Sequence, residues 1–176
     1  MRIILAILSL LFITCKSQHI DSDKFVNEKK VFTLYENCPD NGNCNIEILP
    51  DSELEVKQDE FGNLYPNIKI GNKLIIKYHY KRTPIENTAD SNYSEIIYFE
   101  LNNDKINLDL QNEKLNEVKL LFGRLCYCKG ATGYYKVSKG DLQVKMSQKN
   151  LTINLQFEVK KIPQIIHAIN ESIILN

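Results

Sequence analysis

Four cysteines in two short pairs are the side chains of this sequence with the widest choice of chemistry. Cys38 and Cys44 flank a loop rich in turn residues, and Cys126 and Cys128 stand one residue apart in LCYCKGATGYY. Four thiolates could hold a zinc ion, a reactive pair could exchange disulfides, or two disulfides could staple a fold. Spacing and cellular compartment are the evidence that separates these three roles.

The spacing of the cysteines argues against the metal and redox roles. Structural zinc sites usually place about two to four residues inside each cysteine pair, but one pair here encloses five residues and the other a single residue. A redox pair needs a thiol with a lowered pKa, typically at a helix start in a thioredoxin-like pattern, and the sequence has no such pattern. We therefore expect neither a metal nor a cofactor.

No other motif forms a recognisable catalytic or ligand-binding constellation. The three histidines are scattered at His19, His79 and His167, and neither a G-x-S-x-G nucleophile motif nor a Walker phosphate loop occurs. Lys and Arg number 22, as do Asp and Glu, so there is no basic excess for a nucleic acid. We expect a protein that is not an enzyme and does not bind nucleic acid. The alternative is an enzyme, or a thiol redox or metal-binding protein, that uses the four cysteines.

The elements that must position these residues are predicted to be short strands. Apolar and polar residues alternate in LTINLQFEVK and in LQVKMS before it, with SQKN as a hairpin connection. In NIKIGNKLIIKYHY, Gly71-Asn72 stands between two strands as a two-residue turn with positive φ. Further strands are expected at Val31–Tyr35, Cys44–Leu49, Leu54–Lys57, Ile96–Leu101 and Ile106–Leu110. The pattern predicts a mainly β fold, either an antiparallel β-sandwich or an open barrel.

Two segments fit both a helix and a strand. Residues 113–122 place Leu115, Val118 and Phe122 at helical spacing, yet they could also run as a strand into the cysteines. In residues 163–175 the isoleucines recur at helical spacing after a proline, although β-branched residues also suit a strand. We expect one short C-terminal helix from Pro163 to about Asn170.

The N-terminus, MRIILAILSLLFITC, has the pattern of an export signal. Arg2 gives a positive start, and the uncharged run from Ile3 to Thr14 is too short to span a bilayer, which needs about 20 residues. LFITC, followed by KSQ, resembles the lipobox of bacterial lipoproteins over residues 1–18. The resemblance implies that Cys15 becomes the lipid-modified first residue of the mature chain, with acyl chains that anchor it to a membrane surface.

The resemblance sets an expected organisation and location. Residues 1–14 are the signal peptide, residues 15–30 are the lipidated cysteine with a polar tether, and residues 31–176 are a single β-rich domain. We expect a cell-envelope protein anchored to a bacterial membrane through lipid on Cys15, with the outer membrane favoured over the inner one.

In an exported chain, the four remaining cysteines are expected to form disulfides. If Cys126 and Cys128 lie in an extended strand, their Cα atoms are about 6.6 Å apart, near the outer limit for a bridge. We therefore favour cross-links from the 38–44 loop to the 126–128 strand, each worth about 4 kcal/mol. Local pairing of Cys38 with Cys44 is the alternative, and it leaves Cys126 and Cys128 bridged to each other or free.

The tyrosines supply the one candidate binding surface. Tyr134 and Tyr135 point to opposite faces if the chain is extended there, so that one of them can meet a partner. We expect a non-catalytic binding or assembly module whose partner is a protein, a glycan or a small ligand of the envelope.

Overall fold

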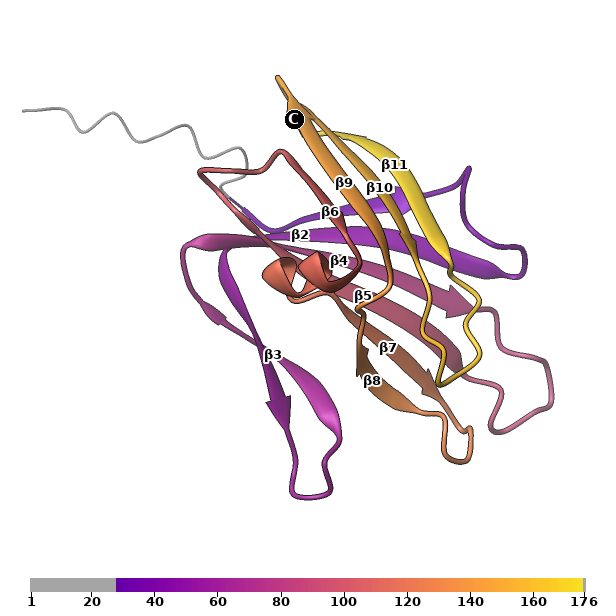
Figure 1. Ribbon diagram of the computed structural model, residues 1–176. Helices are drawn as coiled ribbons and strands as arrows, with labels where there is room; N and C mark the ends of the chain where they lie inside the picture. Colours follow the sequence, from indigo (N-terminus) through magenta and orange to yellow (C-terminus); the bar gives the residue numbers. More distant parts are fainter. Residues whose placement is uncertain (1–27, 176) are drawn as a thin grey trace, which may run out of the picture.

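The computed structural model describes residues 28–175, which form two antiparallel sheets (Figure 1). The first sheet contains β1 (Lys30–Leu34), β2 (Gly42–Gln58), β3 (Leu64–Ile70), β4 (Lys73–Arg82), β5 (Tyr93–Asn102), β7 (Leu121–Cys126) and β8 (Gly133–Lys136). The second contains β6 (Leu108–Gln111), β9 (Gly140–Ser147), β10 (Asn150–Phe157) and β11 (Ala168–Ile174). A short 3-10 helix, η1 (Asn112–Val118), precedes β7. The mainly β fold is confirmed, whereas the signal peptide, Cys15 and most of the tether lie outside the described residues.

The first sheet closes into a six-stranded barrel through its longest strand. Its order is β2-β3-β8-β7-β5-β4, and β4 returns to pair with β2. The register between β2 and β4 shifts between Leu49 and Ser52, where Asp51 has a φ of 48°. This bulge places one extra residue in β2. Even-numbered residues of β2 therefore face the outside of the barrel before the bulge and the barrel interior after it. Ile48 before the bulge and Leu54 after it consequently belong to different cores.

The two cores lie on opposite faces of the barrel wall. The larger one joins the outer face of the barrel to the second sheet, as in a sandwich, and includes Ile76, Phe99 and Phe122 against Val144 and Leu155. The smaller one fills the barrel interior with Leu54, Ile75, Ile96, Tyr98 and Leu121. The protein is therefore a barrel and a sandwich at once, because one sheet curls and also carries a second sheet on its back (Figure 1).

A buried ion cluster closes one end of the barrel interior. The Glu100 carboxylate is 2% exposed and accepts hydrogen bonds from Lys73, from Lys119 at 3.0 Å and from the Leu54 N–H at 3.1 Å. Lys119 also donates to the Leu54 carbonyl at 2.7 Å. Burial by itself would raise the pKa of Glu100, but the hydrogen bonds from the two lysines outweigh it and lower that pKa.

The predicted turn at Gly71-Asn72 joins two strands that do not pair with each other. Ser52 pairs with Ile70 of β3 on one edge and with Lys73 of β4 on the other, so the connection crosses over β2. A Cβ at Gly71 would lie 2.6 Å from the Cβ of Glu53. Glycine is required here by close backbone approach, not by a positive φ, and the expected hairpin is wrong. The β9–β10 hairpin around residues 148 and 149, in contrast, is confirmed.

The two ambiguous segments resolve differently. Residues 113–122 begin as η1 and continue as β7, with Leu115 and Val118 buried beneath the helix. The expected C-terminal helix from Pro163 to about Asn170 is wrong, because β11 pairs with β10 from Ala168 onward. The N–H groups of Ile165 and Ile166 donate to a side-chain carboxylate of β5, so they do not enter a helical hydrogen-bond ladder.

Candidate binding groove

The four cysteines form two local disulfides, and the favoured cross-links are wrong. Cys38 bonds to Cys44 and Cys126 to Cys128, with Cα–Cα distances of 5.6 and 5.2 Å. Two strands, β4 and β5, lie between β2 and β7 in the sheet. At about 4.8 Å per strand, Cys44 and Cys126 are some 14 Å apart and cannot be bridged.

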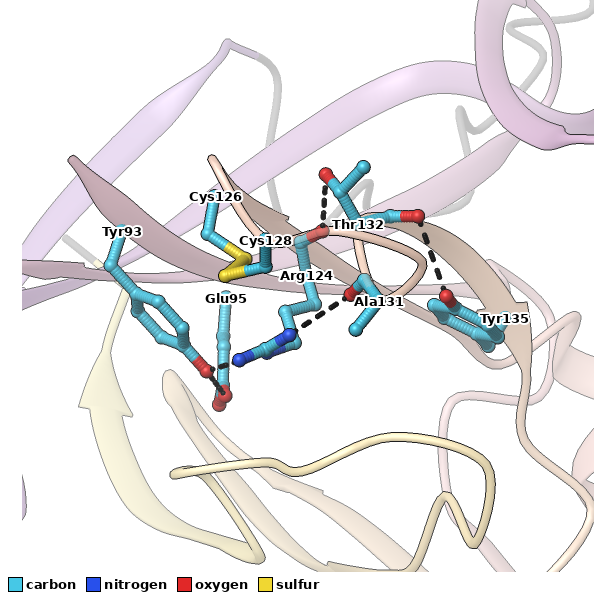
Figure 2. Close-up of a disulfide and its surroundings, with 8 residues drawn as sticks. All are labelled: Tyr93, Glu95, Arg124, Cys126, Cys128, Ala131, Thr132 and Tyr135. Atoms are coloured by element: carbon cyan, nitrogen blue, oxygen red, sulfur yellow. Dashed lines mark hydrogen bonds between the residues drawn. A yellow bond between two sulfur atoms is a disulfide. The ribbon is translucent and has the colours of Figure 1, made fainter. Parts of the chain in front are cut away.

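The short Cys126–Cys128 bridge is possible because the chain bends. β7 ends at Cys126, and Tyr127 lies in a bend, which brings the two Cα atoms closer than an extended strand would. The following turn is held by the Ala131 N–H, which donates to the Cys128 carbonyl at 3.2 Å, and by the Thr132 hydroxyl, which donates to the Arg124 carbonyl at 3.2 Å. The bridge therefore fixes the start of β8 (Figure 2).

Beside this turn, Arg124 is held between β5 and the 128–132 loop. Its Nε donates to the Tyr93 hydroxyl at 3.2 Å, and its Nη1 donates to the Ala131 carbonyl at 3.1 Å (Figure 2). The guanidinium carbons of Arg82 and Arg124 lie 4.9 and 5.2 Å from the centroid of the Tyr93 ring. Burial and the hydrogen bond to Glu95 raise the pKa of Tyr93 to about 12, so its hydroxyl stays protonated and can donate.

Glu95 is the fully buried carboxylate that receives this hydrogen bond. Its oxygens also accept the N–H groups of Ile165 and Ile166, each at 2.7 Å. The three donors satisfy a carboxylate that is 0% exposed, which removes most of the penalty for burying it. They also pin the connection between β10 and β11 to the barrel wall.

The two tyrosines predicted as a binding surface lie on opposite faces of β8. Tyr134 points into the barrel, where its ring covers Gly123, and a Cβ on that glycine would be 2.4 Å from the ring. Burial raises the pKa of Tyr134. Tyr135 packs on the other face, and its hydroxyl donates to the Thr132 carbonyl at 3.4 Å. Both residues border the same depression in the surface.

This depression, the larger pocket, has a volume of about 820 Å³. It is enclosed by four segments: the tip of the β2–β3 hairpin, the N-terminal end of η1, β8 with the residues after it, and the chain after β10. Its lining residues are Gly62, Asn63, Leu64, Asn112, Glu113, Thr132, Gly133, Tyr134, Tyr135, Lys136, Ser138, Lys139, Glu158, Val159, Lys160 and Lys161.

A smaller pocket of about 560 Å³ shares Lys136 with the larger one. It lies between β2, at Leu54 and Val56, and the chain from Asn116 to Leu120. Both pockets occur where the barrel is weakly closed, because β3 and β8 pair at a single position, Leu64 with Tyr134. We call the two pockets together the seam groove.

The seam groove carries more positive than negative charge. Six lysines and four glutamates line it. Lys139 pairs with Glu158, and Glu53 lies 3.7 and 3.8 Å from Lys69 and Lys119. Within residues 28–175, three lining lysines form no ion pair, namely Lys136, Lys160 and Lys161.

The sequence pattern predicts the tyrosines of the groove but not its lysines. Lys136 follows Tyr135 directly, whereas Lys160 and Lys161 lie on the connection between β10 and β11. Their only sequence signal is a pair of adjacent lysines after a strand, which is ordinary surface composition. The fold brings the segments together through the Glu95 hydrogen bonds, which no local pattern announces.

Residues 28–175 contain neither a candidate metal site nor a membrane-spanning helix. The described part of the chain contains no group of three His, Cys, Asp or Glu side chains placed to bind a metal ion. Nor does any helix among residues 28–175 have the length and apolar character to cross a membrane. No protein-family model matches the chain, and neither does any curated protein or solved structure.

Proposed function

We propose that this protein is a cell-envelope lipoprotein, anchored through Cys15, that binds a ligand without chemical conversion. The seam groove is the observation that carries the binding part of this proposal. A depression of about 820 Å³ is in the size range of ligand sites. Such sites are typically lined by aromatic side chains together with a few polar groups, as this one is.

The disulfides agree with an exported protein. Cys38–Cys44 and Cys126–Cys128 are both paired, and disulfides persist mainly in oxidising compartments outside the cytoplasm. The export signal and the lipobox-like LFITC motif supply the membrane part of the proposal.

Two of the four carboxylates that line the groove are not poised as general acids. A hydrogen bond from Lys139 lowers the pKa of Glu158, and one from Asn67 lowers the pKa of Glu55. Both groups therefore remain ionised at neutral pH, whereas a general acid needs a raised pKa. The enzyme alternative would require a poised group of this kind in the groove.

Membrane anchoring is tested by cell fractionation of the full chain. Cys15→Ser should move the protein from the membrane fraction to the released fraction, because it removes the acylated side chain. Ser17→Ala, two residues further on, is the matched control and should stay with the membrane. Retention of the Cys15→Ser protein in the membrane fraction contradicts the lipoprotein proposal.

Binding is tested in intact cells with a photocrosslinking amino acid. Placed at Lys136 it should yield an adduct, whereas placed at Ile174, an exposed position on β11 outside the groove, it should not. The captured molecule is identified by mass spectrometry and its binding to the purified protein is measured. Equal adducts at both positions, or none at Lys136, would count against the groove.

A further inference from the structure

We propose that the seam groove binds an extended acidic peptide, which adds as a strand to the open edge of β8. This inference rests on the proposed binding function and narrows the ligand to one class. Its three supports are the direction of backbone groups on β8, the absence of a neighbouring strand beyond Tyr134, and the charge of the pocket walls.

The backbone of β8 alternates between its two neighbours. The Val137 N–H donates to the Leu120 carbonyl at 3.0 Å, on the β7 side. Backbone groups of successive residues in a strand point to opposite sides, so those of Tyr134 and Lys136 point away from β7. Tyr134 meets Leu64 of β3 there. The N–H and C=O of Lys136 face the groove.

No strand covers this edge beyond Tyr134. In the described residues, β3 and β8 share the single pair Leu64–Tyr134, and β3 begins at Leu64 after the 59–63 hairpin tip. An uncovered edge is a template for a further strand, and proteins that bind peptides in this way use such edges. The larger pocket runs along it, lined by Lys136 and Ser138.

The charges of the walls select an acidic partner. Lys136 lies on the edge itself, and Lys160 and Lys161 stand on the connection between β10 and β11. None of the three has an ion pair within residues 28–175, whereas Glu158, an acidic residue of the same wall, is bound to Lys139. A strand with acidic side chains can satisfy both the backbone edge and the three ammonium groups, of which Lys160 has a longer-range attraction to Glu158 and no ion pair. An anionic glycan could pair with the ammonium groups but could not continue the β-ladder.

The direct test uses three blocked octapeptides and the purified protein. The probes are alternating Glu-Val, alternating Lys-Val, and the Glu-Val peptide with every backbone amide N-methylated, so that neither edge of the strand can donate. Fluorescence polarisation should detect the first, with affinity that falls as salt is raised, and should detect neither of the others up to about 1 mM. N-methylation keeps all charges but removes the amide donors, so it isolates strand addition from charge attraction.

Variants and amide exchange locate the binding. Lys160→Glu with Lys161→Glu should weaken the Glu-Val peptide about tenfold, as expected for reversing two exposed charges. Lys145→Glu with Lys149→Glu, on the exposed β9–β10 hairpin, is the matched control and should have little effect. Bound peptide should also slow exchange of the Lys136 amide.

Several results would overturn the inference. Equal binding of the N-methylated peptide would reduce the groove to a site for anions, and stronger binding of polygalacturonate than of any peptide would make the ligand a glycan. Absence of binding by all three peptides also refutes it. Each of these results leaves the proposed function standing if the crosslinker at Lys136 captures a ligand, so the two proposals fail separately.

Discussion

Replacing Glu95 by glutamine tests whether one buried carboxylate holds a wall of the groove in place. The carboxylate accepts hydrogen bonds from the Tyr93 hydroxyl and from the N–H groups of Ile165 and Ile166. Glutamine has nearly the same shape but only one acceptor oxygen. Its amide NH₂ must take the place of the other oxygen and would then face a donor.

The magnitude follows from these contacts. Hydrogen bonds to a charged acceptor contribute about 1.5–3 kcal/mol against about 0.5–1.5 for neutral ones, and a buried donor left unsatisfied costs about 1–3. Relief from burying a charge offsets part of the loss. We expect the Glu95→Gln protein to lose about 2–3 kcal/mol of unfolding free energy. At about 3 °C per kcal/mol in a domain of this size, its Tm should fall by about 6–9 °C.

Urea unfolding, calorimetry and hydrogen exchange measure the two parts of this effect. The amides of Ile165 and Ile166 should exchange faster in the Glu95→Gln protein, because their acceptor is weakened. Glu158→Gln, on the same connection but with an exposed side chain, should leave Tm unchanged. Unaltered Tm together with unaltered exchange at both amides would refute the role given to Glu95.

Two further predictions concern the barrel interior. The pKa of Glu100 is lowered in the folded state, so its contribution to stability is present above its unfolded pKa of about 4.3 and is lost as pH falls through the folded value. The urea midpoint should therefore drop on acidification below about pH 4, and less so in Glu100→Gln; identical pH profiles for the two proteins would exclude this cause. Gly123→Ala places a Cβ 2.4 Å from the Tyr134 ring and should cost about 1–3 kcal/mol in urea unfolding. Adding Tyr134→Leu should recover part of that loss, and a double variant no more stable than Gly123→Ala would point to another origin.

Sequence periodicity was sufficient for most strands because one face of each is buried. Leu151, Ile153 and Leu155 are fully buried and alternate with polar residues, and the hairpin before them was predicted at the correct place. Periodicity does not distinguish helix from strand after Pro163, because the isoleucines there fit helical spacing and, as β-branched residues, also suit a strand. The side chain that resolves it, Glu95, is 70 residues away from Ile165.

Strand order was the information that the sequence did not contain. The sequence allows cross-links from Cys44 to Cys126, but β4 and β5 lie between the strands that carry these cysteines. The crossing of Gly71 over β2 and the gathering of Lys136 with Lys160 around one pocket depend on the same long-range arrangement. Tyr134 and Tyr135 are predictable from the sequence because adjacent residues of a strand lie on opposite faces.

The bulge in β2 makes one position of this strand unusually tolerant of a shorter chain. Three steps along β2, from Leu49 to Ser52, lie opposite two steps along β4, from Ile75 to Lys73. One residue removed there would give two steps against two, so Leu49 and Ser52 would keep their partners and their faces. Leu54 would still face the barrel interior, and Ile48 would stay in the other core. A residue removed elsewhere in β2 would instead turn the side chains on one side of the deletion to the opposite face, so homologous chains should lose a residue at Pro50 or Asp51 more readily than at other positions of this strand.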